Sequence, residues 1–381
     1  MKIGFLINPI AGMGGAVGLR GTDDNAFLEA FRRGARPVAP MIARRFLNCL
    51  RSLCSTLVLE RARFFAAPHI MGFDYFIDVG LPAREVDVKV SYPTTRDDTI
   101  KSVETMIREG IDVIVFVGGD GTARDIASIA APSQIPILGV PAGVKMFSAV
   151  FAVSPEAAAA IVCKCLEERC TEIEAEVLDL DEDSYRRDHL SVRLYAIVKT
   201  LGLPNLLAPR KDVTVGDEEA KKGIARYFVE ELMKPNVLYI LGPGSTVKAI
   251  ADELGIEKTL LGFDAVVNGK LVARDLWGRK MLEIVKSFKE RKLVLTPIGG
   301  QGFLIGRGNK QLTPEILRYF DKEDLIIVAT PSKVAKLRYL IVDTGDPELD
   351  SRYRSYHRVI VGYREEIVMK IIAARDLIEL V

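Results

Sequence analysis

The sequence is poor in the residues that build metal centres and hydrolase sites. Its 381 residues include three histidines, five cysteines and one tryptophan. The histidines, His69, His189 and His357, lie far apart and have no Cys or His at a ligand spacing, so no histidine metal site is expected. The absence of any Gly-x-Ser-x-Gly segment argues against an α/β-type serine hydrolase.

Cysteine is too scarce for a disulfide scaffold in a chain of this length. Three cysteines do cluster, Cys163, Cys165 and Cys170, within an Ala-rich helical pattern. Helical residues two apart differ by roughly 200° around the axis, which suits shared zinc ligation poorly. We therefore favour buried thiols over a zinc site and expect no metal-ligating cluster.

Neither sign of charge is in excess, because 52 Lys and Arg face 51 Asp and Glu. A balanced charge gives no reason to expect a nucleic acid partner. Prolines, a glycine and a lysine interrupt the longest apolar stretch, residues 135–153, so no membrane span is expected. The apolar start, residues 1–7, is too short for a signal peptide, which favours a cytoplasmic protein.

The length exceeds the roughly 250–300 residues at which single cores stop growing, so two domains are expected. Residues 1–150 alternate strands and helices, which predicts a doubly wound α/β domain. Residues 151–324 are predicted to form a β-rich second domain, and residues 325–381 an α/β tail that returns to the first. The expected strands include residues 2–7, 86–90, 111–117 and 135–140, the expected helices 97–110 and 156–168, and the expected hairpin 260–275.

The sharpest motif is Gly118-Gly119-Asp120-Gly121-Thr122, directly after the apolar run of residues 111–117. Glycines at a strand end let the backbone approach a ligand, and free N–H groups there suit a phosphate. A carboxylate in such a loop makes sense if Asp120 accepts a hydroxyl proton, binds a ribose hydroxyl or orients Mg²⁺. The alternative is a simple Asp-Gly turn with Thr122 as a helix cap.

This motif resembles the signature of the superfamily of NAD kinases, diacylglycerol kinases and 6-phosphofructokinases. The nearer resemblance is to ATP-NAD kinase-like proteins. It rests also on four further segments spread over the chain: Asn8 to Gly12, Pro141 to Met146, Gly242 to Thr246 and Thr296 to Gly302. The resemblance implies an α/β N-terminal domain, a β-rich C-terminal domain and a site between them.

The resemblance also assigns roles to residues. Asp120 would contact the adenosine ribose of NAD and activate its 2′-hydroxyl, as the catalytic residue. The remaining residues would bind nucleotide, with Gly244, Ser245 and Thr246 contributed by the second domain. They are Asn8, Gly118, Gly119, Gly121, Thr122, Lys145, Gly244, Ser245 and Thr246.

The expected activity is a kinase that uses ATP or polyphosphate, with Mg²⁺, to convert NAD to NADP. One departure bears on the acceptor: the Asn-Glu pair with which NAD kinases recognise NAD is absent from the whole sequence. A lipid or another small alcohol therefore stays open as the acceptor, as does a non-catalytic nucleotide sensor. Lys145 is otherwise an ordinary solvated lysine.

Two other glycine-rich segments have open roles. Residues 12–21 lack the Gly-Lys-Ser/Thr ending of a phosphate-binding Walker loop, so they form either a flexible loop or a cover over phosphates. Residues 299–308 form either a third ligand loop or a structural bend. NAD kinases are usually homo-oligomers, so the resemblance implies a dimer or tetramer whose partners are small-molecule nucleotides.

Overall fold

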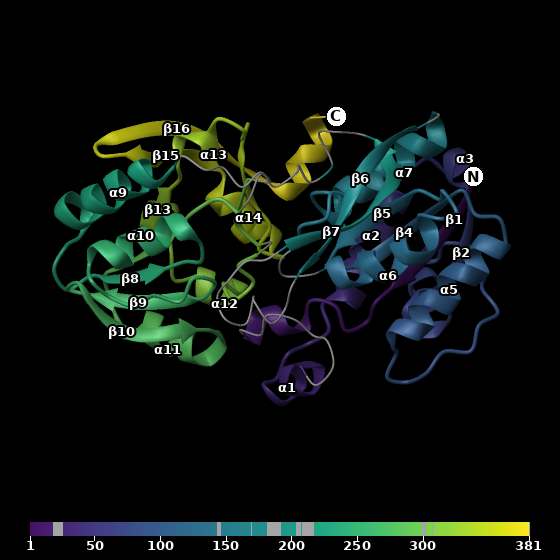
Figure 1. Cartoon of the computed structure of the whole chain (residues 1–381), viewed down its shortest axis with the longest axis horizontal. Helices are drawn as coiled ribbons and strands as arrows, with labels where there is room; N and C mark the ends of the chain where they lie inside the picture. The colour runs from purple at the N-terminus through teal and green to yellow at the C-terminus, as the bar shows by residue number, and fades with distance from the viewer. Residues whose placement is uncertain are drawn as a thin grey trace. The chain divides into compact units, whose positions relative to one another are not determined.

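A computed structural model of the chain (Figure 1) divides it into two compact units. Unit 1 comprises Met1–Gly14, Gly21–Arg210 and Arg375–Val381, and unit 2 comprises Gly15–Arg20 and Lys211–Ala374. The structure describes residues 1–17, 26–142, 146–168, 170–180, 192–202, 207, 217–298, 302–306 and 308–380.

Unit 1 is built on a five-stranded parallel sheet in the order β3-β2-β1-β4-β5. The two central strands are near-continuous apolar runs and are buried almost throughout, as expected for parallel strands covered by helices. The strands are β1 (Lys2–Ile7), β2 (Arg63–Ala66), β3 (Arg84–Glu85), β4 (Val113–Gly118) and β5 (Ile137–Pro141).

The helices of unit 1 begin where the sequence supplies capping residues. The side chain of Ser154 accepts a hydrogen bond from the Ala157 amide (3.1 Å), and Thr95 and Asp98 form a capping box. The helices are α1 (Ala26–Arg32), α2 (Ala39–Leu53), α3 (Thr56–Leu59), α4 (Phe73–Val79), α5 (Arg96–Arg108), α6 (Asp120–Ala130) and α7 (Pro155–Glu167), with 3-10 turns η1 (Met13–Val17), η2 (His69–Met71) and η6 (Ala374–Leu380).

A long antiparallel hairpin, β6 (Thr171–Leu180) with β7 (Val192–Gly202), also belongs to unit 1. Its apolar face, Ala175, Val177 and Val198, is buried in the same core as α6 and β4. The expected start of the second domain at residue 151 is therefore wrong, because this apolar face packs on the first unit.

Unit 2 contains a nine-stranded sheet in the order β10-β9-β8-β11-β13-β15-β16-β14-β12. Its middle strands, β8, β11, β13 and β15, are parallel, and antiparallel pairs flank them. The strands are β8 (Leu238–Leu241), β9 (Phe263–Val267), β10 (Lys270–Leu276), β11 (Arg291–Leu295), β12 (Phe303–Ile305), β13 (Leu325–Val328), β14 (Leu340–Val342), β15 (Ser355–Gly362) and β16 (Glu365–Ala373).

Strands β13 to β16 complete the sheet of unit 2, so the predicted return of residues 325–381 to the first domain is wrong for most of the tail. Only Arg375–Val381 joins unit 1. The helices of unit 2 are α9 (Glu218–Tyr227), α10 (Ser245–Glu253), α11 (Gly278–Ser287), α12 (Pro314–Leu317), α13 (Pro331–Val334) and α14 (Pro347–Tyr353), with the π-helical turn η3 (Phe228–Leu232) and the 3-10 turn η5 (Lys322–Asp324).

The predicted fold class is confirmed: an α/β parallel-sheet unit is followed by a β-rich one. The prediction of a strand at residues 86–90 is wrong, because backbone pairing with β2 ends at Val86. The amide of Val86 bonds to Ala66 of β2 (2.9 Å), but the amide of Val88 turns back to the carbonyl of Val86 (3.0 Å). This tight turn leaves β3 only two residues long.

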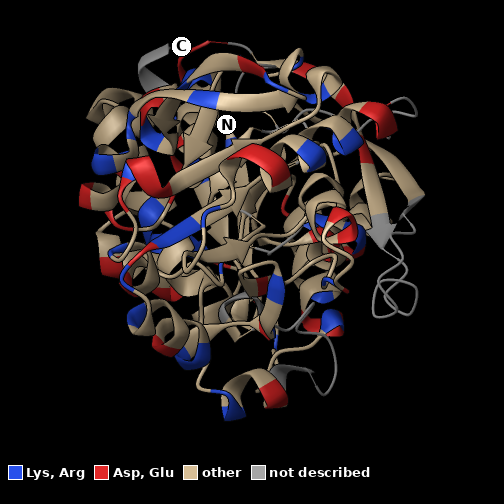
Figure 2. Ribbon diagram, turned by 90° about the vertical axis from the view of Figure 1, so that its left-hand side faces the viewer, with Lys and Arg blue, Asp and Glu red and all other residues tan. Residues whose placement is uncertain are grey.

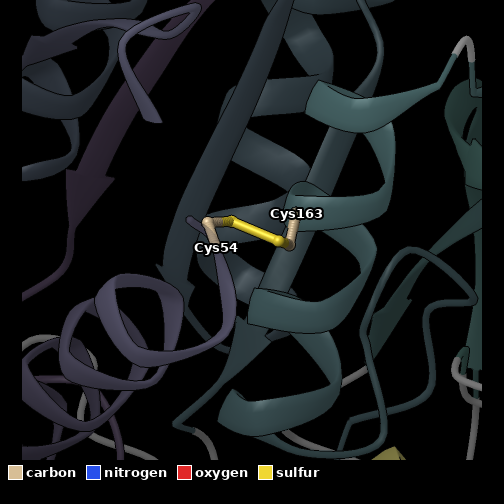
Figure 3. The surroundings of a disulfide bond; sticks show 2 residues. All are labelled: Cys54 and Cys163. Atoms are coloured by element: carbon tan, nitrogen blue, oxygen red, sulfur yellow. A yellow bond between two sulfur atoms is a disulfide. The ribbon is translucent and has the colours of Figure 1, made fainter. Parts of the chain in front are cut away.

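The clustered cysteines form disulfides, which corrects the expectation of buried thiols. One disulfide joins Cys54, after α2, to Cys163 of α7, with Cα atoms 5.6 Å apart (Figure 3). The other joins Cys165 to Cys170. Cys163 and Cys165 thus have different partners, as their positions on different sides of a helix require. Cys49 is a free thiol, and burial raises its pKa to about 11.

Basic and acidic residues are interspersed along the ribbon in Figure 2, which matches the balanced charge of the sequence. Within the described part of the chain, no helix combines the length and the apolar character that crossing a membrane requires.

Candidate functional site

The strand order of unit 1 places a ligand position between β1 and β4. Strands β1, β2 and β3 follow one another toward one edge of the sheet, whereas β4 and β5 lie on the other side of β1. Loops at the carboxyl ends of two such strands diverge, and ligands of doubly wound proteins bind at this switch point. Asn8 follows β1, and the Gly118–Thr122 motif lies at the end of β4, so both predicted segments meet there.

Asn8 and Thr122 join the two strand ends directly. The side-chain amide of Asn8 donates to Oγ1 of Thr122 (3.2 Å), and its carbonyl oxygen accepts from the amide of Ile10 (3.2 Å). The amide of Asn8 bonds to Val117 of β4 (2.9 Å). Thr122 is buried at 4% exposure. These hydrogen bonds hold the ends of β1 and β4 together at the switch point.

Two glycines of the motif differ in what surrounds them. A Cβ atom on Gly118 would lie 2.6 Å from Cβ of Thr122, so the close approach of β4 and α6 requires glycine there. A Cβ atom on Gly121 would meet no atom within 4 Å. Contacts within the protein therefore explain why residue 118 must be glycine. They do not explain the glycine at position 121, which lies in open space in the first turn of α6.

Asp120 is the first residue of α6 and holds the loop after β5. Its carboxylate accepts hydrogen bonds from the backbone amides of Phe147 (2.6 Å) and Ser148 (2.9 Å). These bonds fix the orientation of the carboxylate at the switch point. A carboxylate has about four acceptor sites, so the arrangement is compatible with a further bond from a substrate hydroxyl.

The contact between Asp120 and residues 147–148 was not predicted from the sequence. Ser148 is buried, and its hydroxyl accepts from the amide of Leu178 in β6 (3.0 Å). The hairpin thereby braces the loop that contacts Asp120. Backbone donors leave no side-chain signature, so only the Pro-Ala-Gly segment after β5 pointed to this region.

A second carboxylate, Asp125, lies one turn further along α6. It accepts hydrogen bonds from Arg96 (2.8 Å) and Arg124 (3.3 Å). Burial raises the pKa of Asp125, and the two arginines oppose this shift. Because α5 begins at Arg96, this ion pair ties the start of α5 to the middle of α6.

The predicted residues of the C-terminal region lie in unit 2, at the carboxyl end of β8. Gly244 precedes α10 with φ +116°, and Ser245 and Thr246 form the first turn of that helix. Ser245 is exposed, whereas Thr246 is buried at 1% exposure. The structure thus groups these three residues with each other, in a different unit from Asn8 and Asp120.

In the other glycine-rich segment of unit 2, residues 299–308, the backbone conformation and the packing require glycine at the described positions. Gly302, Gly306 and Gly308 all have positive φ. A Cβ atom on Gly306 would lie 2.3 Å from the carbonyl oxygen of Asp343, and one on Gly302 would lie 2.7 Å from that of Tyr339. This packing favours the structural bend over a ligand loop. Lys145, residues 18–21 and residues 299–301 lie outside the described residues.

Comparison with protein families identifies the chain. The ATP-NAD kinase N-terminal domain matches residues 3–170, and the ATP-NAD kinase C-terminal domain matches residues 234–371. The chain belongs to the ATP-NAD kinase family. It is therefore a kinase, and kinases of this family use ATP and NAD as substrates. No curated protein and no solved structure matches the chain significantly.

Proposed function

We propose that this kinase transfers a phosphoryl group from ATP or polyphosphate to the 2′-hydroxyl of NAD, giving NADP. The observation that carries the proposal is the position of Asp120 at the switch point, with its carboxylate oriented by two backbone amides. A carboxylate repels phosphates, so its presence in a phosphate-type loop is explained by a hydroxyl that must be oriented and deprotonated.

In the proposed reaction, Asp120 accepts a hydrogen bond from the ribose hydroxyl and takes its proton as the new O–P bond forms. The bond between the transferred phosphorus and the departing phosphate breaks, so ATP leaves as ADP. The N-terminus of α6, a helix of 11 residues, and the amides of Gly119 and Gly121 offer partial positive charge to phosphate. Catalysis would come mainly from positioning and charge neutralisation.

Magnesium fits this site as an ion brought by the donor. The described residues contain no group of three or more His, Cys, Asp or Glu side chains that could hold a metal on its own. In phosphoryl transfer, Mg²⁺ is usually held by one or two carboxylates together with substrate phosphates. The ion would be held mainly by the donor's phosphates and would neutralise their charge, while Asp120 serves the hydroxyl.

The direct test is NADP formation by the purified protein with Mg²⁺, NAD and either ATP or polyphosphate. Asp120→Asn should abolish it, whereas Asp97→Asn, at an exposed position of α5, should not. Unchanged NADP formation in Asp120→Asn would remove Asp120 from the mechanism. Phosphorylation of a lipid or small alcohol in place of NAD would change the acceptor, and binding without turnover would indicate a sensor.

A further inference from the structure

The β6–β7 hairpin of unit 1 supports both partners of the Asp120 hydrogen bonds. The hairpin lies within residues 171–233, between the segments that match the two family domains. Its inner face packs on α6, the helix that Asp120 begins, in a core that contains Ala123, Ala175 and Val177. The backbone of β6 also bonds to the loop after β5, whose amides bind the Asp120 carboxylate. One element thus holds the carboxylate and its donors.

Hydrogen bonds join β6 to the loop after β5. The amide of Ala149 donates to the carbonyl oxygen of Glu176 (2.8 Å), as the backbone of a neighbouring strand would. Two residues further along β6, the partner is a side chain. The hydroxyl of Ser148 accepts from the amide of Leu178 (3.0 Å) and donates to its carbonyl oxygen (3.4 Å). Ser148 is buried at 1% exposure, so these bonds form away from water.

The direction of the loop amides explains why a hydroxyl is needed at position 148. The amides of Phe147 and Ser148 donate to the Asp120 carboxylate (2.6 and 2.9 Å) and not to β6. The backbone of Leu178 therefore needs another partner that can both donate and accept. A serine hydroxyl can do both, whereas an alanine side chain can do neither.

The pairing of the hairpin is irregular at the same point. Along β6, Val177 pairs with Ala196, and the next residue pairs with Leu194. Tyr195 is therefore an extra residue on β7, which is the pattern of a β-bulge. Bulges redirect the groups of a strand and are frequent next to active sites. The register of the hairpin thus changes at the residue of β6 that bonds to the loop.

We propose that Ser148 is a positioning residue of this kinase and acts on the reaction through Asp120. The inference rests on the proposed role of Asp120 as the base. The Ser148 hydroxyl holds the loop on β6, and the loop amides orient the carboxylate. Without the hydroxyl the amides shift, so the carboxylate no longer meets the acceptor hydroxyl in the geometry that proton transfer requires.

Steady-state kinetics of Ser148→Ala test this role. The variant should lower kcat by about tenfold or more and change the KM for NAD by less than about twofold, because the geometry of the reacting groups is lost and not the binding of NAD.

The matched control is Ser154→Ala. Ser154 is also a buried serine of unit 1, and its hydroxyl accepts from the backbone amide of Ala157 (3.1 Å). Both variants lose such a bond, so both should have a lower melting temperature, but Ser154→Ala should keep the wild-type kcat. Equal kcat values in Ser148→Ala and Ser154→Ala would overturn the proposal.

Amide hydrogen exchange gives a readout that needs no turnover. In Ser148→Ala the amide of Phe147 should exchange about tenfold faster or more, because its bond to Asp120 opens more often. Ser154→Ala should not change this rate. Unchanged exchange of the Phe147 amide in Ser148→Ala would contradict the link between the hydroxyl and the carboxylate.

The two proposals can fail separately. If the wild type forms no NADP but the Phe147 amide responds as expected, the proposed function is wrong and the link between Ser148 and Asp120 holds. If the wild type forms NADP and Ser148→Ala has the same kcat, the positioning role alone is wrong.

Ser148→Cys covers the case in which Ser148→Ala does not fold. A thiol is close to a hydroxyl in size but is a weak donor and a weak acceptor. The kcat should therefore still fall, and the exchange of the Phe147 amide should still rise. Wild-type values of both in Ser148→Cys would contradict the proposal.

Discussion

The two units use the same scaffold with opposite charges. Each ends parallel strands in loops of Gly, Ser and Thr that start a helix. Unit 1 places the carboxylate of Asp120 there and holds it by backbone amides, whereas unit 2 places the ammonium of Lys333 there and holds it by neutral oxygens. A carboxylate suits a hydroxyl that must lose a proton, and an ammonium suits a phosphate. The difference shows that the carboxyl ends of parallel strands can hold a charged side chain of either sign.

The largest expected effect is at Asp120. Asp120→Asn keeps the size of the side chain but removes the base, so NADP formation should fall by about 10²–10⁴-fold, the usual contribution of general base catalysis. Steady-state rates measure this, and thermal unfolding shows whether the variant is folded. A folded Asp120→Asn variant that forms NADP at the wild-type rate would contradict the role of this carboxylate.

Removing a disulfide should lower the stability of unit 1 but not that of unit 2. Cys54 and Cys163 are 109 residues apart in unit 1. Replacing both with serine should lower the free energy of unfolding of unit 1 by about 2–4 kcal/mol. Far-UV circular dichroism should show the earlier transition, while the fluorescence of Trp277, in unit 2, should not shift. Cys49→Ser is the control. Finding five reactive thiols in the unfolded, unreduced protein would show that the disulfides are absent.

Alanine substitutions at Gly118 and Gly121 should distinguish a packing role from a ligand-binding role within unit 1. Gly118→Ala forces Thr122 to move and should lower the free energy of unfolding by about 1–3 kcal/mol. Gly121→Ala meets open space within α6 and should leave stability unchanged or raise it by up to about 1 kcal/mol. Its nucleotide affinity should nevertheless fall. Urea unfolding and NAD titration measure both, and normal affinity in Gly121→Ala would mean that no ligand approaches this glycine.

The smallest expected effect is the pH dependence of stability at Lys333. Its pKa is about 8 in the folded protein, below the ordinary value of 10.5. Between these values the unfolded chain binds more protons, so stability should rise with pH across this window through this group. Below pH 8 the lysine is charged in both states and its desolvation cost remains. Lys333→Met should lack this rise, which paired urea unfolding curves at pH 7.5 and 9.5 would show. Identical pH dependence in both proteins would contradict the assignment.

The sequence predicted the switch point of unit 1 well, for a physical reason. Strands β1 and β4 are buried on both sides, so they read as continuous apolar runs, and the Gly118–Thr122 motif follows one of them. Their ends meet because the sheet is parallel. In the structure, the side-chain amide of Asn8 donates a hydrogen bond to Thr122 across these two strand ends.

What escaped the sequence depends on tertiary contacts. The amides of Phe147 and Ser148 carry no side-chain signal, and the pairing of Cys54 with Cys163 spans 109 residues. In the sequence, Lys333 looks like an ordinary surface lysine. Its desolvation arises from loops that follow three different strands, and the sequence alone does not show that these loops meet. The hairpin β6–β7 has an acidic outer face that suggested a new domain, whereas its inner face completes the core of unit 1.

The measurement that tests the central claim most directly is a crystal structure of the protein with NAD and a non-hydrolysable ATP analogue. If Asp120 is the base, the ribose 2′-hydroxyl of NAD should lie within hydrogen-bonding distance, about 2.6–3.2 Å, of its carboxylate. A structure in which NAD is bound but Asp120 contacts only the amides of Phe147 and Ser148 would contradict it.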